Sequence, residues 1–186
     1  MRLIAAVLSC LVALPAWSLE TFVFDPEHTF PSFEIRHQNI STFRGKFTRS
    51  QGRAVLDPQG PDSQIELVVD ASSGTTGHDG LDRKLAGMLF FNAGRFPEIR
   101  FSSNQVEFVD AKPVKVHGQL TLLGVTRPVT LEVRDYACGH QFLTRRPMCG
   151  ADVHAVIRRS DFGMTFGIPG IGDEVRLAIE VEGFRQ

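Results

Sequence analysis

Period-two alternation of apolar and polar residues recurs along almost the whole chain and restricts the fold more than any other feature. Val129 to Arg134, for example, alternates without interruption. Residues two apart lie on the same face of a strand, so each such segment has one apolar and one polar face. The pattern predicts eight or nine strands, in segments 21–24, 32–37, 43–55, 65–69, 100–109, 117–123, 129–134, 151–157 and 175–181.

Short turn-forming segments separate these strands, at 57–61, 112–113, 124–128 and 168–172. Short connections favour antiparallel neighbours. An antiparallel sheet of this size either pairs into a sandwich or closes into a barrel, and closure removes the exposed edges. An eight-stranded barrel has room inside for one slender ligand.

One segment, 78–89, has the spacing of a helix. Leu81, Leu85 and Leu89 recur every four residues, and Asp79 suits the N-cap. A single helix among so many strands does not make a parallel α/β fold. We expect it to form a plug or lid over one end of the curved sheet.

Phenylalanine dominates the aromatic residues, with fifteen Phe against one Tyr and one Trp. Phe has a large apolar surface and no hydrogen-bonding group. A chain so rich in it builds either a solid dry core or a chamber for an apolar guest. The composition alone leaves both readings open.

Residues 1–18 resemble a cleavable export signal. Arg2 precedes the apolar run 3–14, and Ala16 and Ser18 place small residues at the cleavage site. The run is too short to span a bilayer. A lipoprotein signal at Cys10 is the rival interpretation. We expect one exported domain at 19–186, without stable membrane insertion.

The net charge of −1 argues against nucleic-acid binding.

Two cysteines remain after this leader, Cys138 and Cys149. They predict a disulfide, because exported proteins enter an oxidising compartment in which an even number of cysteines usually pairs. A bridge here would join two neighbouring strands at a hairpin. The rival is a metal site that adds His140, but it lacks a fourth ligand.

No catalytic motif stands out. The six histidines fall in no metal-binding spacing, and neither a nucleophile elbow nor a phosphate-binding loop is present. Ser160 and Asp161 with a remote histidine would be a hydrolytic set, but Ser-Asp before Gly163 is typical of a turn or cap. We therefore expect a protein that is not an enzyme and has no metal or cofactor.

A series of ordered motifs resembles the YceI-like family of periplasmic proteins. The segments that carry the resemblance are Phe24-Asp25-Pro26-Glu27-His28-Thr29, 33–37, 41–47, Phe90-Phe91, 95–101, 118–129, 159–164 and 172–175. They span nearly the whole chain after the leader. The resemblance implies an extended eight-stranded, lipocalin-like antiparallel barrel that holds a polyisoprenoid or isoprenoid quinone, and it implies no catalytic residues.

The chain departs from the family pattern in the helix. The family has an Arg, a His and an acid where this sequence has Leu81, Lys84 and Leu89. If the helix lines the cavity mouth, the mouth is more apolar here. Head-group contacts of relatives therefore do not transfer directly.

Together these observations predict a periplasmic carrier of a long apolar lipid, monomeric or homodimeric, with a link to stress. The alternatives are a lipid-modifying enzyme with the barrel as its substrate tunnel and a solid-cored barrel that binds a protein partner. His37 is either a rim residue bonded to backbone or a head-group contact. The candidate ligand-binding residues are Phe33, Ile35, His37, Phe47, Leu85, Leu89, Phe90, Phe101, Leu122, Phe162, Met164 and Phe166.

Overall fold

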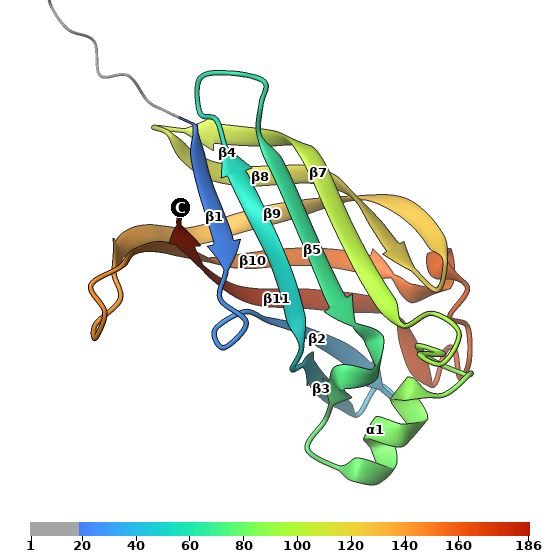
Figure 1. Ribbon diagram of the computed structural model, residues 1–186. Helices are drawn as coiled ribbons and strands as arrows, with labels where there is room; N and C mark the ends of the chain where they lie inside the picture. Colours follow the sequence, from blue (N-terminus) through green and yellow to red (C-terminus); the bar gives the residue numbers. More distant parts are fainter. Residues whose placement is uncertain (1–18) are drawn as a thin grey trace, which may run out of the picture.

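The computed structural model describes residues 19–186, and the predicted signal peptide at 1–18 lies outside them (Figure 1). The described chain is built mostly of antiparallel strands. These are β1 (Glu20–Phe24), β2 (Phe30–His37), β3 (Ser41–Phe47), β4 (Ser50–Leu56), β5 (Gln64–Asp70), β6 (Gly74–Thr75), β7 (Glu98–Val109), β8 (Lys112–Leu122), β9 (Val125–His140), β10 (Pro147–Arg158) and β11 (Ile171–Arg185). Two short 3-10 helices, η1 (Ala71–Ser73) and η2 (Arg159–Phe162), and one α-helix, α1 (Asp79–Ala86), complete the described elements.

These strands close into a barrel. Within residues 19–186 the pairing runs β1-β4-β5-β7-β8-β9-β10-β11, and β11 returns to β1 through Phe22–Phe24. The other half of β11 pairs with β2, which pairs with β3, which pairs with β6. Thus β1 and β2 follow one another along β11, and the eleven segments occupy eight strand positions. The predicted eight-stranded antiparallel, lipocalin-like barrel is confirmed.

Two tight hairpin turns join β7 to β8 and β8 to β9. The first lies at 110–111 instead of the predicted 112–113, and the second lies at 123–124, at the start of the predicted 124–128. Asp110 and Ala111 both have positive φ between β7 and β8, as do Leu123 and Gly124 between β8 and β9. Paired positive φ values match the twist of a tight hairpin. Pro113 instead lies within β8, so that predicted turn was wrong by two residues.

Helix α1 is shorter than predicted. His78, rather than Asp79, is the N-cap, and its Nδ1 accepts a hydrogen bond from the Gly80 N–H. The helix stops at Ala86 because Gly87 takes an extended conformation. Asp82 fastens the helix to the preceding segment by accepting bonds from the Thr75 and Thr76 hydroxyls. These bonds, that from Thr76 foremost, hold the pKa of the Asp82 carboxyl below its usual value.

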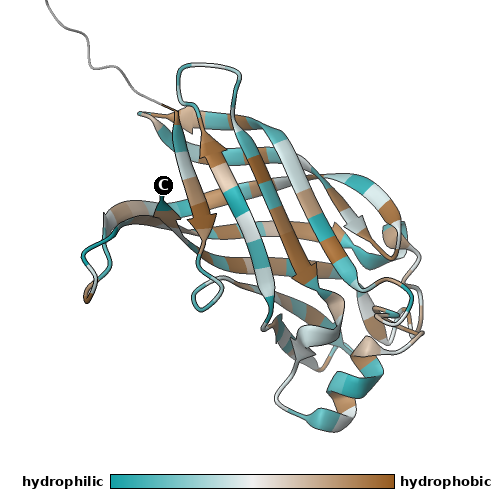
Figure 2. Cartoon of the chain, in the orientation of Figure 1, coloured by the Kyte–Doolittle hydropathy of each residue, from teal (hydrophilic) through white to brown (hydrophobic). Residues whose placement is uncertain are grey.

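Apolar and polar residues alternate along the strands, as the teal and brown bands of Figure 2 show. The inward residues include several phenylalanines whose rings lie flat against the wall. An added Cβ at Gly45 would lie 2.5 Å from Phe33 Cζ, and the Phe101 ring covers Gly118 in the same way. A glycine has no side chain, so the ring of a neighbouring strand can lie directly over its backbone. These rings therefore cover the inner face of the sheet and do not project into the middle of the barrel.

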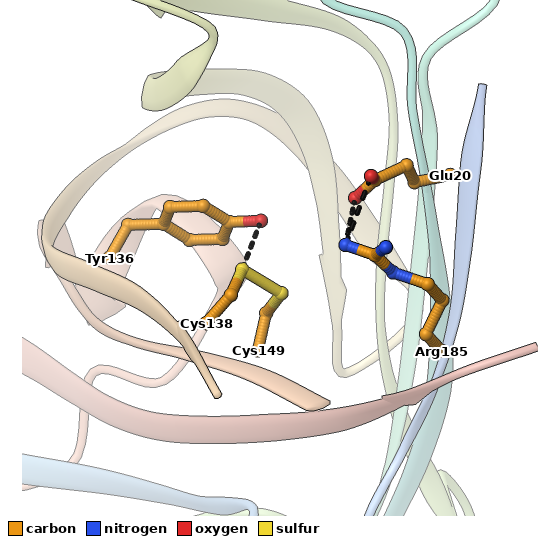
Figure 3. The surroundings of a disulfide bond; sticks show 5 residues. All are labelled: Glu20, Tyr136, Cys138, Cys149 and Arg185. Carbon is orange, nitrogen blue, oxygen red and sulfur yellow. Dashed lines mark hydrogen bonds and ion pairs between the residues drawn. A yellow bond between two sulfur atoms is a disulfide. The ribbon is translucent and has the colours of Figure 1, made fainter. Parts of the chain in front are cut away.

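The predicted disulfide is present. Cys138 and Cys149 are directly paired residues of β9 and β10, and their sulfurs are bonded (Figure 3). Both thiols are consumed, so the rival metal site with His140 is wrong. The Tyr136 hydroxyl donates to the Cys138 Sγ at 3.3 Å, and burial raises the pKa of this phenol. In Figure 3 the ion pair between Glu20 and Arg185 lies nearby, where β1 closes on β11.

Replacing both cysteines by alanine is expected to lower the free energy of unfolding by roughly 2–3 kcal/mol, because a loop of this length loses the constraint on its unfolded state. Urea denaturation of the oxidised protein and of the double variant measures the difference. Reduced wild-type protein serves as the control and should match the variant. A difference below about 0.5 kcal/mol would contradict the expectation.

No helix of residues 19–186 has the length and apolar character that a bilayer crossing requires.

Candidate functional site

The barrel interior is hollow. An apolar cavity of about 480 Å³ lies between the sheet walls, toward the end covered by α1. This volume is within the range of roughly 300–1,000 Å³ that is typical of ligand sites. The solid-cored alternative is therefore wrong, since side chains do not fill the interior from end to end.

The cavity wall is almost entirely hydrocarbon. Of the described residues that line it, only Ser32, His37, Lys84 and Arg159 have polar or charged side chains. Seven phenylalanines contribute to the wall: Phe33, Phe43, Phe47, Phe90, Phe91, Phe101 and Phe166. Phe33, Phe47 and Phe91 pack edge to face or tilted, with ring centroids 5.1–6.2 Å apart. A site of this kind favours a long apolar guest over a polar one.

The mouth of the cavity is formed by α1 and two loops. Leu81, Lys84 and Leu85 of the helix line it from one side. The rings of Phe90 and Phe166, from the loops after α1 and η2, meet edge to face at 5.6 Å. The predicted lid is therefore present in the form of α1 and these two loops.

His37, at the end of β2, also lines the cavity. Its ring has no hydrogen-bond partner among the described residues, so the interpretation as a histidine bonded to backbone is wrong. His37 and Lys84 together place two polar groups where an otherwise apolar cavity meets solvent.

Arg159 holds the loop that carries Phe166. This side chain is only 2% exposed, yet no carboxylate bonds to it among the described residues. Instead its guanidinium donates to four backbone carbonyl groups: those of Gly172 at 2.7 Å, and of Met164, Phe166 and Ile171 at 2.9 Å. Burial lowers the pKa of this guanidinium, and nearby Asp173 opposes that effect. One buried cation thus fixes the shape of the whole loop.

A second, smaller cavity of about 110 Å³ lies toward the disulfide end of the barrel. It shares four wall residues with the large cavity: Leu67, Phe101, Leu131 and Ile179. These four side chains separate the two spaces. The two cavities therefore lie one behind the other along the barrel, with these shared side chains between them.

Ten of the twelve candidate ligand-binding residues line the large cavity: Phe33, Ile35, His37, Phe47, Leu85, Phe90, Phe101, Leu122, Met164 and Phe166. Their contact with a ligand stays a prediction. The other two lie elsewhere. Leu89 follows the end of α1, loses the helical phase and is exposed. Phe162 belongs to η2, and its ring is buried in the core outside the cavity lining.

Several lining residues were not selected from the sequence. Leu67, Val69, Leu120, Val175 and Leu177 follow the same alternation as the chosen ones, so the strand phase was a sufficient signal. Arg159 gave no such signal, because a second arginine precedes it and both are typical of a surface. Its burial depends on the fold of the following loop.

Ser160, the candidate hydrolytic nucleophile, is hydrogen-bonded to Asp173. Its hydroxyl donates to Asp173 Oδ2 at 2.8 Å, and its backbone N–H donates to Asp173 Oδ1 at 2.9 Å. This pair stabilises η2 at the start of the loop, as a turn or cap does.

Among the described residues, Asp25, His28 and Glu182 form a group whose ligand atoms lie within 4.8 Å of one another. His28 Nδ1 is bonded to Asp25 at 2.8 Å, and this bond raises the pKa of the imidazole. Burial alone would raise the pKa of Asp25, but the bonds from His28 and the Glu27 N–H bring it below its usual value. The pair therefore stabilises the turn between β1 and β2.

Comparison with known sequences identifies relatives along most of the chain. Residues 22–183 match the YceI-like domain. A UPF0312 protein of Yersinia enterocolitica is 32% identical over 164 residues, covering 86% of this chain and 82% of the relative. Protein YceI of Salmonella newport is 30% identical over 161 residues, covering 86% and 83%.

Comparison with solved structures finds the same barrel. BcnA of Burkholderia cenocepacia superposes with a TM-score of 0.71 at 22% identity, covering 86% of this chain and 98% of that protein. A polyisoprenoid binding domain from Saccharophagus degradans gives 0.64 at 19% identity, covering 89% and 98%. The Campylobacter jejuni YceI protein gives 0.65 at 26% identity, covering 81% and 90%.

Proposed function

This chain belongs to the YceI-like family, and we propose on that premise that it binds the hydrocarbon chain of a polyisoprenoid or isoprenoid quinone inside the barrel. The observation that carries the proposal is the cavity of about 480 Å³ with its nearly continuous apolar wall. The structural similarity to a polyisoprenoid binding domain supports the same ligand class.

The binding energy would come from removal of hydrocarbon from water. Each buried CH₂ group contributes about 0.8 kcal/mol, and ordering of the chain takes part of that back. An apolar wall provides no hydrogen bonds that distinguish one lipid from another. Length and width of the ligand would therefore decide selectivity more than its head group, for which His37 and Lys84 are the nearest polar partners.

We assign the protein to the periplasm, as a single domain at 19–186 released from its leader. The disulfide between Cys138 and Cys149 fits an oxidising compartment. In that aqueous space a lipid needs a carrier or a store, and stress that damages the envelope would increase the need. The proposed role is binding without turnover, because the site wall consists almost entirely of hydrocarbon and Ser160, the candidate nucleophile, caps a turn through Asp173.

Extraction of the purified protein with organic solvent tests the proposal. Protein exported to a bacterial periplasm and purified without detergent is expected to release an isoprenoid lipid, identified by mass spectrometry. The same preparation stripped of lipid is expected to take up an added isoprenoid quinone. Protein that carries no lipid and takes up no quinone would contradict the proposal, and conversion of the lipid to a product would favour the enzyme alternative.

A further inference from the structure

Exposed apolar side chains gather around the cavity mouth. Ile40 and Met88 are 81% and 84% exposed. Leu89, Phe166 and Ile168 are exposed as well. They come from three loops: the β2–β3 turn, the loop after α1 and the loop between η2 and β11. We call these five side chains the mouth rim. Apolar groups grouped on a surface in this way mark a site of interaction.

The three loops are joined into one rim by direct contacts. The ring of Phe90, next to Leu89, packs on Phe166. The Gln38 N–H, in the β2–β3 turn, donates to the Gly170 carbonyl group in the η2–β11 loop. Phe90, Phe166 and His37, the residue before Gln38, all line the cavity. The rim side chains, which lie at or close to these residues in the chain, therefore border the cavity opening.

Four cations lie in or next to the segments that form this rim. Arg36, Arg83, Lys84 and Arg95 are exposed, and none of them forms an ion pair within residues 19–186. Of the neighbouring acids, Asp82 is occupied by the threonines that fasten α1, and Glu34 is paired with Arg44 at 2.6 Å. Asp79, in the first turn of α1, is exposed and forms no ion pair within residues 19–186, so the four cations outnumber the free acid. The surface around the opening therefore combines protruding apolar groups with unpaired cations, which suits anionic lipid head groups above an apolar layer.

We propose that the mouth rim docks on an anionic phospholipid bilayer, so that lipid passes between the membrane and the cavity without crossing water. This inference rests on the proposed function. A bilayer is the expected partner because these exposed apolar side chains come from the three joined loops that also contribute residues to the cavity lining. Docking there would shield both the rim and the entering hydrocarbon.

The opposite end of the barrel provides a matched control. The tip of the β9–β10 hairpin, drawn in orange in Figure 1 far from α1, carries Phe142 and Leu143 at 87% and 80% exposure. Arg145 and Arg146 follow them, so the tip also combines apolar and cationic side chains. Arg146, however, lies over the Phe184 ring at 4.1 Å, and the tip does not line the large cavity.

Sedimentation with vesicles tests the docking. Wild-type protein is expected to bind vesicles of phosphatidylglycerol and phosphatidylethanolamine, and to bind phosphatidylcholine vesicles more weakly. The variant Ile40→Ser/Met88→Ser is expected to lose about tenfold in vesicle affinity, because the two most exposed of the five apolar side chains of the rim are removed. The variant Phe142→Ser/Leu143→Ser, which removes two side chains of similar exposure at the other end, is expected to stay within about twofold of the wild type.

The lipid content of the same preparations separates this inference from the proposed function. Ile40→Ser/Met88→Ser protein should keep its extractable lipid, since neither residue lines the cavity. Wild-type protein that holds lipid but ignores anionic vesicles would overturn the docking alone. So would a loss confined to the hairpin variant, or a rim variant whose only change is dissociation of a dimer in gel filtration. Absence of lipid from every preparation would instead overturn the proposed function.

Discussion

A Val175→Trp variant is expected to carry at least about tenfold less extractable lipid than the wild type, a loss that corresponds to roughly 1.4 kcal/mol of binding free energy or more. Val175 lies on β11 opposite Ile35 of β2 and Ile157 of β10, and its side chain lines the cavity. An indole there occupies the space that the hydrocarbon needs. Mass spectrometry of solvent extracts, normalised to protein, measures the effect.

The matched control is Val156→Trp on the neighbouring strand. Val156 is exposed and lies beside Ile157, whose side chain faces the cavity, so alternation directs it outward. Its lipid content should equal that of the wild type. Because the indole of Val175→Trp enters empty space, the free energy of unfolding should fall by less than about 2 kcal/mol. Equal lipid content in the two variants, with Val175→Trp folded, would show that the cavity is not the binding site.

Replacing Arg159 by methionine is expected to lower the free energy of unfolding by about 3–5 kcal/mol. The four carbonyl groups that accept its hydrogen bonds would lose their partner, at a point where the Arg159 side chain is only 2% exposed. Urea denaturation measures the loss. Limited proteolysis should show new cleavage within residues 163–170, since within residues 19–186 no other side chain donates a hydrogen bond to any of these carbonyl groups.

Arg158→Met is the control for this result, because it removes the same charge one residue earlier. Arg158 is 69% exposed and forms a surface ion pair with Asp173 at 3.0 Å. Exposed pairs contribute about 1 kcal/mol or less, so this variant should remain close to the wild type in stability and cleavage pattern. If both variants behaved alike, the loop would not depend on the buried cation.

Local patterns predicted most of the cavity wall. Val175, Leu177 and Ile179 alternate in sequence and all line the cavity, because strand geometry turns every second residue to the same side. The same rule accounts for Phe33 and Ile35. The cysteine pair was predictable for a similar reason, since compartment and spacing narrowed the choices to a bridge or a metal site.

The errors fall where periodicity ends. The four-residue spacing from Leu81 to Leu89 looked continuous, but Gly87 ends the helix and releases Leu89 to solvent. Phe162 follows the last residue of β10 by four positions, and η2 turns its ring into the core. Both residues were assigned to the cavity from the hydrophobic pattern. That pattern does not show where a helix or strand ends.

The sequence by itself determined the strands, the inward face of each and the apolar character of the interior, because these depend on neighbours one to four residues away. Only the tertiary structure decided that the interior is open. Barrel closure joins residues 22–24 to residues 183–185, and rings such as Phe101 lie flat against glycines of another strand. These contacts set the space that remains between the walls, and they depend on packing between segments distant in the chain, which hydrophobic periodicity does not encode.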